Sequence, residues 1–344
     1  MAEAPGATNL WARAATALVS VGRHRGLVAL LVVFVLGALV SPHNLKTGEN
    51  VFLSPGNQSN VLFEYAEYGL LAVGMTLVIL TAGIDLSVGS VLGLSATLFA
   101  YLLIAWGWNP WPAAGLSLVV GTGCGVVSGL MVSRLRMQPF VATLAMMVAA
   151  RGAAKWISGG IKIADGARPW YALQHGPPEV FGWMTAPLAG GWLRPVTLCF
   201  LVAITVMALV VHYTRFGRHL YAIGGNEEAA RLSGIPVGLA KTLAYGISGL
   251  TAGLAGVCNA CRTSYGDPEA GFTYELDAIA AVVIGGTSLM GGRGGMVLTL
   301  VGTLIVGYAN KILSLIGWQE AQRLLAKGII IVLAVVIQET RRRR

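Results

Sequence analysis

The sequence predicts an all-α protein, a polytopic transmembrane bundle of about ten helices with both termini in the cytoplasm. Hydrophobic residues make up 55% of the 344 residues and charged residues only 11%, and the mean hydropathy is +0.70. These values lie far from those of a soluble domain. The apolar runs are long and continuous instead of alternating, which argues against a transmembrane β-barrel.

A span of about 20 residues locates ten apolar stretches along the chain. In order, they are Gly26–Val40, Val61–Ala82, Leu86–Trp106, Pro112–Ser133, Phe140–Ile157, Pro195–Tyr213, Leu243–Ala260, Leu276–Met290, Met296–Ile316 and Leu324–Ile337. The first stretch is short for a complete span. The eighth ends in a glycine-rich run, so it is a candidate for a tilted, broken or re-entrant segment.

Basic residues gather at alternate loop ends and orient the predicted bundle. The groups are Arg13, Arg23 and Arg25, then Arg134 and Arg136, then Arg215, Arg218 and Arg231, and last Arg341–Arg344. With ten spans, all four groups fall on one side, which the positive-inside rule assigns to the cytoplasm. The chain then divides into a cytoplasmic segment over 1–25, a transmembrane domain over 26–338 and a basic tail over 339–344. Because topology explains the net charge of +9, no nucleic-acid partner is expected.

A charged, amphipathic insert, GGNEEAARLSGIPV over 224–237, interrupts two long apolar stretches. Its alanines favour a short helix, and the glycine and proline that follow end it. The residues of interest are Glu227, Glu228, Ala229, Ala230, Arg231 and Gly234. On the cytoplasmic side this helix would give a soluble partner a grip on the membrane helices. An ordinary connecting loop is the alternative interpretation.

Glycines recur at intervals of four along several predicted helices. The sets are Gly89 and Gly93, then Gly121, Gly125 and Gly129, then Gly249 and Gly253. Residues four apart share one helix face, and small residues there let helices approach closely in lipid. These sets are predicted to be packing seams, along which helices could slide or rock.

Ionisable residues inside apolar stretches are costly, so they are candidates for a translocation path or a gate. Four such residues stand out: Asp85, Arg151, Glu275 and Asp277. Asp85 follows a helix-breaking glycine and is predicted to cap the next helix. Arg151 precedes Lys155 by one turn, so this pair could form ion pairs, line a hydrated path or extend to the interface. Glu275 and Asp277 head a helix, where negative charge is favourable.

Motifs of bound nucleotide and of hydrolysis do not occur in the sequence. It contains neither a G-x-x-x-x-G-K-[ST] phosphate loop nor the H-E-x-x-H or G-x-S-x-G pattern. Cys258 and Cys261 form a C-x-x-C pair, but no second pair accompanies them, which favours simple packing over metal or redox chemistry. The sequence therefore predicts no catalytic residue, no metal site and no cofactor bound by this chain.

Four segments carry a family resemblance in combination. They are GMTLVILTAGIDLSVGSVLGLSA, RLRMQPFVATLAMMVAARG, EEAARLSGIPV and ELDAIAAVVIGGTSLMGGRGG. Together they resemble the membrane permease subunits of bacterial ABC importers for monosaccharides, the ribose, xylose, arabinose and galactofuranose group. The resemblance runs in the same order from about Val61 to the end of the last predicted span. The segments 46–60 and 163–192 depart from the family pattern.

The resemblance implies a multi-pass permease of the bacterial inner (plasma) membrane that works with other chains. These partners are an ATPase subunit that binds ATP and Mg, a periplasmic sugar-binding protein, and a second permease that is either a copy or a paralogue. The family's coupling segment maps onto Glu227, Glu228, Ala229, Ala230 and Gly234 and implies docking in a cleft of the ATPase. Movement of that segment would rock the bundle between outward-facing and inward-facing states.

Other functions stay open at this stage. The same machine could import nucleosides or branched-chain amino acids; a carboxylate substrate would favour a cationic site or helix N-terminus in the path. An ion-coupled secondary transporter would need midspan carboxylates, whereas the acidic residues here cluster near span ends. A purely structural membrane subunit would leave the charged insert without a role.

Overall fold

The computed structural model describes residues 25–44, 46, 48–164, 178–188, 190–329 and 332. Within these ranges the regular structure is helical, and two isolated bridges, His43–Asn50 and Ile163–Gly266, are the only β pairings. The all-α prediction is therefore confirmed for this part of the chain. The basic groups before residue 25, the tail over 339–344 and half of the last predicted span lie outside the described residues.

Six helical stretches of the described chain are long and apolar enough to cross a membrane. They are α5 (Val88–Ala100) continued by the π-helix η1 (Tyr101–Ala105), α6 (Pro110–Ser133), α7 (Pro139–Ser158), α9 (Pro195–Tyr213), α12 (Val237–Thr263) and α14 (Met296–Leu315). A seventh is formed if α3 (Pro55–Glu64) and α4 (Ala66–Leu80), bent by 46°, are one span. A polytopic membrane bundle is confirmed, and the count of ten stays a prediction.

The first and eighth predicted stretches are shorter in the structure than a full span. The helix α2 (Arg25–Val40) has 16 residues, and α13 (Tyr274–Gly285) has 12. The helix α13 ends before the apolar run does, because Gly286 adopts a φ of 115° that terminates the helix. The remaining short helices are α8 (Glu179–Thr185), α10 (Arg215–Gly225) and α11 (Glu227–Leu232), and residues 320–329 are also helical.

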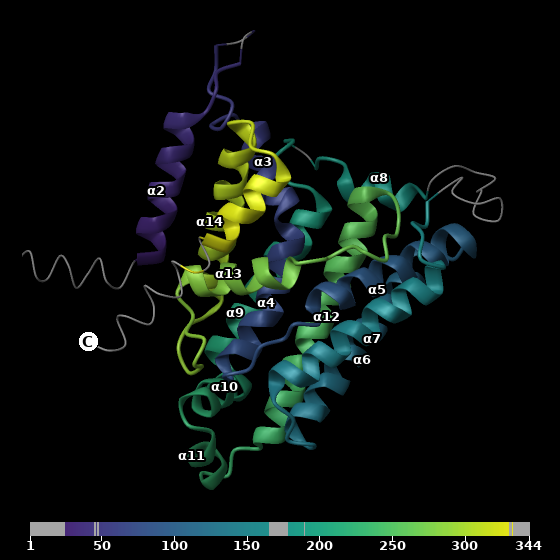
Figure 1. Cartoon of the computed structure of the whole chain (residues 1–344), viewed down its shortest axis with the longest axis vertical. Helices are drawn as coiled ribbons and strands as arrows, with labels where there is room; N and C mark the ends of the chain where they lie inside the picture. The colour runs from purple at the N-terminus through teal and green to yellow at the C-terminus, as the bar shows by residue number, and fades with distance from the viewer. Residues whose placement is uncertain are drawn as a thin grey trace, which may run out of the picture.

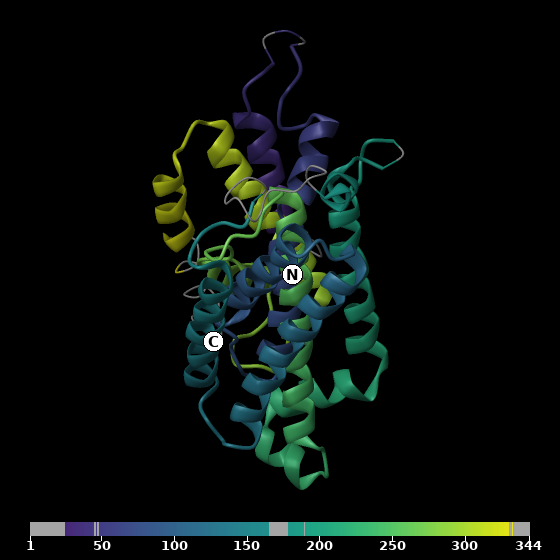
Figure 2. The ribbon, with the colours of Figure 1, turned by 90° about the vertical axis from the view of Figure 1, so that its right-hand side faces the viewer.

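The long helix α12 forms the centre of the bundle and packs against α4, α5 and α6. The most apolar windows of α5 and α12 are 83% and 78% buried, whereas those of α7 and α9 are 28% buried. The outer helices therefore turn apolar side chains toward the lipid. Figure 1 shows α10 and α11 at one end of the bundle and α3 and α8 at the other. Figure 2, turned by 90°, shows the same two ends separated along α12.

Glycines let α6 and α12 approach at backbone distance. A Cβ added at Gly129 would lie 2.7 Å from the Cα of Thr242, and one at Gly121 would lie 2.7 Å from the carbonyl oxygen of Gly249. At Gly125 it would overlap the carbonyl oxygen of Tyr245. This seam leaves no room for a side chain, in keeping with small-residue packing in membranes.

The other glycine set has a different neighbour. A Cβ at Gly93 would lie 2.6 Å from the carbonyl oxygen of Ala270, and one at Gly89 would overlap that of Gly271. Both acceptors belong to the segment between α12 and α13, so these two glycines accommodate a loop and not a second helix.

Replacing Gly125 with alanine is expected to push α6 from α12 and to lower stability by about 1–3 kcal/mol, as overpacking does. Gly123 lies on the same helix with nothing within 4 Å of its would-be Cβ, so Gly123→Ala is the matched control. The measurement is the apparent melting temperature of each purified variant in detergent. Equal melting temperatures would contradict the close approach of these helices.

Candidate functional site

The charged insert folds as a short capped helix, α11, directly after α10. The backbone N–H of Ala229 donates to the side-chain oxygen of Asn226 at 3.0 Å, which caps the first turn. At the other end, Gly234 has a φ of 80°. Its N–H donates to the carbonyl of Arg231 (3.0 Å), and that of Ile235 donates to the carbonyl of Ala230 (3.1 Å). This pattern is a Schellman motif, so the helix ends where the sequence predicts.

One face of α11 is anchored and the other is exposed. Ala230 is 3% exposed and packs in a small apolar cluster with Ile223 of α10 and Val237 of α12. Glu228 is exposed, and the side chain of Leu232 is 81% exposed. The anchored face fixes the helix to the bundle, while the exposed face offers an acidic and an apolar side chain to a partner.

The two glutamates of α11 have different surroundings. One carboxylate oxygen of Glu227 lies 2.6 Å from Lys241 Nζ on α12, and the other lies 3.2 Å from Arg231 Nη2. Partial burial opposes ionisation of Glu227, but the hydrogen bond and attraction from these cations lower its pKa below the ordinary value. Glu227 therefore links α11 to the start of α12, and Glu228 is the more accessible carboxylate.

A groove of about 630 Å³ opens beside α11. It lies between the loop that joins α6 to α7 and the start of α12, and its lining includes Arg134, Arg136, Arg231 and Lys241 together with Glu227. Two of the basic groups that predicted the membrane orientation, Arg134 with Arg136 and the group that includes Arg231, thus line the same groove. They give this end of the bundle a cationic surface next to the exposed carboxylate of Glu228.

The charged insert is connected to the interior of the bundle through contacts at the end of α10. A Cβ at Gly224 would overlap the carbonyl oxygen of Leu80, the last residue of α4. That same oxygen accepts a 3.1 Å hydrogen bond from the N–H of Gly292, and the hydroxyl of Tyr221 donates to the carbonyl of Gly294 at 2.9 Å. The glycine-rich run after α13 therefore joins α10 to the end of α4, and a shift of α10 bears directly on these backbone contacts.

Between α4 and α5 the helix is interrupted, and Asp85 holds the interruption together. Its Oδ1 accepts bonds from the backbone N–H (3.0 Å) and the hydroxyl (2.6 Å) of Ser87, which is itself the N-cap residue of α5, so Asp85 orders the turn before the helix instead of capping its first turn. Its Oδ2 accepts a 2.8 Å bond from the hydroxyl of Ser248 on α12. Asp85 is 1% exposed, so its charge is balanced by hydrogen bonds inside the bundle and lines no described cavity.

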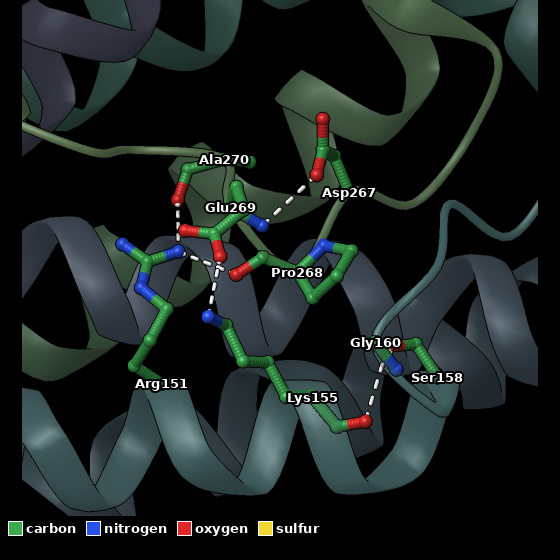
Figure 3. Close-up of polar contacts among 8 residues, drawn as sticks. All are labelled: Arg151, Lys155, Ser158, Gly160, Asp267, Pro268, Glu269 and Ala270. Atoms are coloured by element: carbon green, nitrogen blue, oxygen red, sulfur yellow. Dashed lines mark hydrogen bonds and ion pairs between the residues drawn. The ribbon is translucent and has the colours of Figure 1, made fainter.

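Arg151 and Lys155 grip the segment between α12 and α13 (Figure 3). Arg151 Nη1 donates to the carbonyls of Pro268 (2.5 Å) and Ala270 (2.7 Å), and Lys155 forms an ion pair with Glu269 at 2.5 Å. Among the options open from the sequence, the structure therefore has Lys155 in an ion pair and Arg151 as a clamp on backbone carbonyls.

The acidic residues at the start of α13 diverge. Asp277 is 5% exposed and pairs with Lys327 at 3.0 Å, while Glu275 reaches toward α5, where its Oε2 would meet a Cβ added at Gly89. The four charged candidates lie at two interruptions of the helices. Asp85 lies between α4 and α5, whereas Arg151, Glu275 and Asp277 lie around the segment that precedes α13, where Arg151 and Glu275 attract each other.

A buried network ties α4 to α12 and pairs Glu67 with a partner that the sequence did not indicate. Glu67 is fully buried, and its carboxylate accepts bonds from Arg262 Nε at 2.6 Å and from Asn259 Nδ2 at 2.8 Å. The available signals were two acidic residues early in the second apolar stretch, Glu64 and Glu67, which could form ion pairs, line a hydrated path or extend to the interface, and an arginine in the last turn of another apolar helix. Its carboxylate partner lies 195 residues away in sequence, so the pairing itself was not predictable.

Cys258 and Cys261 are buried, and all four cysteines are free thiols. Among the described residues no group of three or more His, Cys, Asp or Glu side chains has the arrangement of a metal site. The polar contacts described above are hydrogen bonds and ion pairs between helices.

Comparison with known proteins places these features in a family. The pattern of the branched-chain amino acid transport system / permease component family matches residues 57–335. The ribose import permease protein RbsC of Escherichia coli (strain K12) is 40% identical, covering 91% of this chain and 92% of the relative. The galactofuranose transporter permease protein YtfT of the same strain is 36% identical (92% and 89%), and its xylose transport system permease protein XylH is 34% identical (87% and 88%).

Replacing Gly224 with alanine is expected to separate α10 from the end of α4 and to destabilise the protein by about 1–3 kcal/mol. Gly225 is adjacent on the same helix with nothing within 4 Å of its would-be Cβ, so Gly225→Ala is the control. The measurement is hydrogen exchange over residues 78–83, which should become faster only in the first variant. Unchanged exchange in both variants would show that this contact does not hold the helix end.

Proposed function

The chain belongs to the branched-chain amino acid transport system / permease component family, and we propose that it is the permease subunit of an ATP-binding-cassette importer for a monosaccharide. Three relatives that cover most of the chain are named for ribose, galactofuranose and xylose. The observation that carries the proposal is the exposed face of α11, joined through Gly224 to the end of α4. A surface helix with this connection suits a subunit that is moved by another chain.

The proposed assembly contains two permeases, two ATPase chains that hold ATP and Mg, and a periplasmic sugar-binding protein. The second permease is a copy of this chain or a paralogue. We place the protein in the inner membrane with about ten spans, both termini and α11 in the cytoplasm, and a permease domain over 26–338 between the terminal segments 1–25 and 339–344. The cationic groove beside α11 supports this orientation through the positive-inside rule.

In this proposal the ATPase grips the exposed face of α11, with Glu228, Ala229 and Leu232 as contact residues. Closure of the ATPase moves α11 and α10 as one unit, because Asn226 is the only residue between these two helices. The movement reaches Leu80 and the interruption around Asp85, so α4 and α5 change their relative angle. Such a hinge alternates the access of a central path between the two sides of the membrane.

The charge of the cargo separates the proposal from one of its nearest alternatives, the import of branched-chain amino acids, while nucleosides are uncharged like sugars and are distinguished by the uptake experiment below. A free amino acid carries a carboxylate that needs a cation or a helix N-terminus in the path. Arg151, the cation deepest in α7, is occupied by two backbone carbonyls, and Lys155 is paired with Glu269. These engaged cations favour an uncharged cargo.

Uptake into proteoliposomes tests the proposed function. The chain is reconstituted with its ATPase and binding protein, and entry of labelled D-ribose, D-xylose, L-leucine and uridine is followed with ATP inside. We expect uptake of a monosaccharide that stops when the ATPase is catalytically inactivated. Uptake that continues without ATP hydrolysis would favour an ion-coupled carrier, and uptake of leucine or uridine alone would reject the sugar assignment.

Glu228→Arg is expected to lower sugar uptake at least tenfold while the complex still hydrolyses ATP, because it reverses the charge that the exposed face of α11 presents to the ATPase. Glu179→Arg is the matched control, since Glu179 is also an exposed acid in the first turn of a short helix, α8, at the opposite end of the bundle. The measurement is the ratio of sugar imported to ATP hydrolysed. Normal uptake by the Glu228 variant would remove α11 as the coupling element.

A further inference from the structure

A small polar cavity of about 230 Å³ lies where the starts of α4 and α13 meet α14 and the helical residues 320–329. Tyrosine, asparagine, acidic and basic side chains line it, whereas the larger groove along α6, α9 and α12 is lined almost wholly by apolar groups. Its volume is just below the roughly 300–1,000 Å³ of pockets for drug-sized ligands. The cavity therefore suits one small polar solute, and the larger groove suits lipid.

Three tyrosines that line this cavity form an aromatic stack, with Tyr68 between Tyr65 and Tyr274. The ring centroids of Tyr65 and Tyr68 are 5.1 Å apart with 29° between the planes, and those of Tyr68 and Tyr274 are 4.2 Å apart with 30°. The electron-rich face of an aromatic ring attracts weakly positive C–H groups. A sugar ring has a face of such C–H groups and a rim of hydroxyls, so it is complementary to the outer ring face of a tyrosine stack that is surrounded by polar groups.

The polar edge of the cavity offers both donors and acceptors. Arg323 lines it with a buried Nε that has no hydrogen-bond partner in the described chain. Asn310 donates through Nδ2 to the carbonyl of Val306, which leaves its side-chain oxygen as an acceptor. A buried donor without a partner destabilises the protein, and a hydroxyl group that accepts a hydrogen bond from this donor would remove that cost.

The charges in the cavity favour an uncharged ligand. Asp277 and Lys327 lie 3.0 Å apart and neutralise each other, and the exposed Glu320 balances Arg323 in charge. No single sign of charge dominates the lining, so neither an anion nor a cation gains a net attraction. Neutral hydroxyl groups, by contrast, bind to carboxylate, guanidinium and amide groups alike.

The cavity shares α4 with the proposed coupling path. Tyr68 lies in the first turn of α4 and Leu80 is its last residue, so they are separated by 12 residues, about 18 Å along the helix at 1.5 Å per residue. Tyr274 stands on a different helix, α13. A tilt of α4 driven from Leu80 therefore changes the spacing between Tyr68 and Tyr274 and loosens or tightens the tyrosine stack.

We propose that this tyrosine-lined cavity is a transient binding site for a monosaccharide ring, which stacks on the outer face of Tyr274 while Arg323 and Asn310 bind its hydroxyls. The inference rests on the proposed sugar import and deepens it. The sugar is released from the site when α4 moves. A sugar delivered at the end of the bundle opposite α11 then passes onward.

The test uses the chain reconstituted with its ATPase and binding protein. Tyr274→Leu is compared with Tyr308→Leu, because Tyr308 is also a partly buried tyrosine in an aromatic cluster, with Phe34 and Phe52, but lies outside the cavity. We expect the first variant to lower D-ribose or D-xylose uptake about tenfold, with ATP hydrolysis within twofold of the unchanged chain, and the second to retain uptake. Arg323→Gln is a second cavity variant, in case Tyr274→Leu fails to assemble.

A labelling experiment measures occupancy directly. Phe272 lines the cavity and is 70% exposed, so a cysteine in Phe272→Cys should react with a maleimide, and either D-ribose or D-xylose should slow the reaction, with the unchanged chain reporting the native thiols. Equal uptake by the Tyr274 and Tyr308 variants, or labelling that neither sugar alters, overturns the site while sugar import by the unchanged chain stands. Absence of any monosaccharide uptake by the unchanged chain instead rejects the proposed function, and the site falls with it.

Discussion

Backbone polar groups that leave a helix inside a membrane must find partners within the protein, because lipid offers none. This chain interrupts its helices after α4, before α13 and after α13, and each interruption is closed by a segment from elsewhere. The carbonyl of Leu80 receives the N–H of Gly292, and the carbonyls of Pro268 and Ala270 receive Arg151. The interruptions are therefore also junctions between distant parts of the chain.

This requirement explains why so many functional candidates lie at helix ends. Asp85 joins the start of α5 to α12 through Ser87 and Ser248, and the Arg151 clamp fixes the segment that precedes α13. Each polar contact satisfies local backbone or side-chain groups and also sets the position of one helix against another. Charged groups that look isolated in the sequence are thus structural connections between helices. Through these connections, a motion at one interruption passes to the next.

Rigid and adjustable contacts are divided between different faces of α12. Against α6, the glycine seam brings backbones into direct contact, and such a dense interface moves as one body. Against α4, the contact includes the buried ion pair of Glu67 with Arg262. Burying both charges is costly, and a lone charge there would be costlier still, so the pair contributes more to a defined position of α4 than to net stability. The end of α4 next to α10 is held by a backbone hydrogen bond from Gly292 to Leu80, and the proposed coupling movement would act there.

The sequence alone determined the helical membrane class, most helix positions, the capped helix over 227–232 and the glycine seam of α6, because these follow from local periodicity, capping and side-chain size. It placed the end of the eighth stretch too late, since hydropathy does not register the backbone reversal at Gly286. The tertiary structure decided which charges pair. Glu67 and Arg262 are 195 residues apart in the chain, and Arg151 and Ala270 are 119 apart. Coulomb attraction and hydrogen bonds depend on distance in space, and no local pattern encodes the packing of helices that brings such groups together.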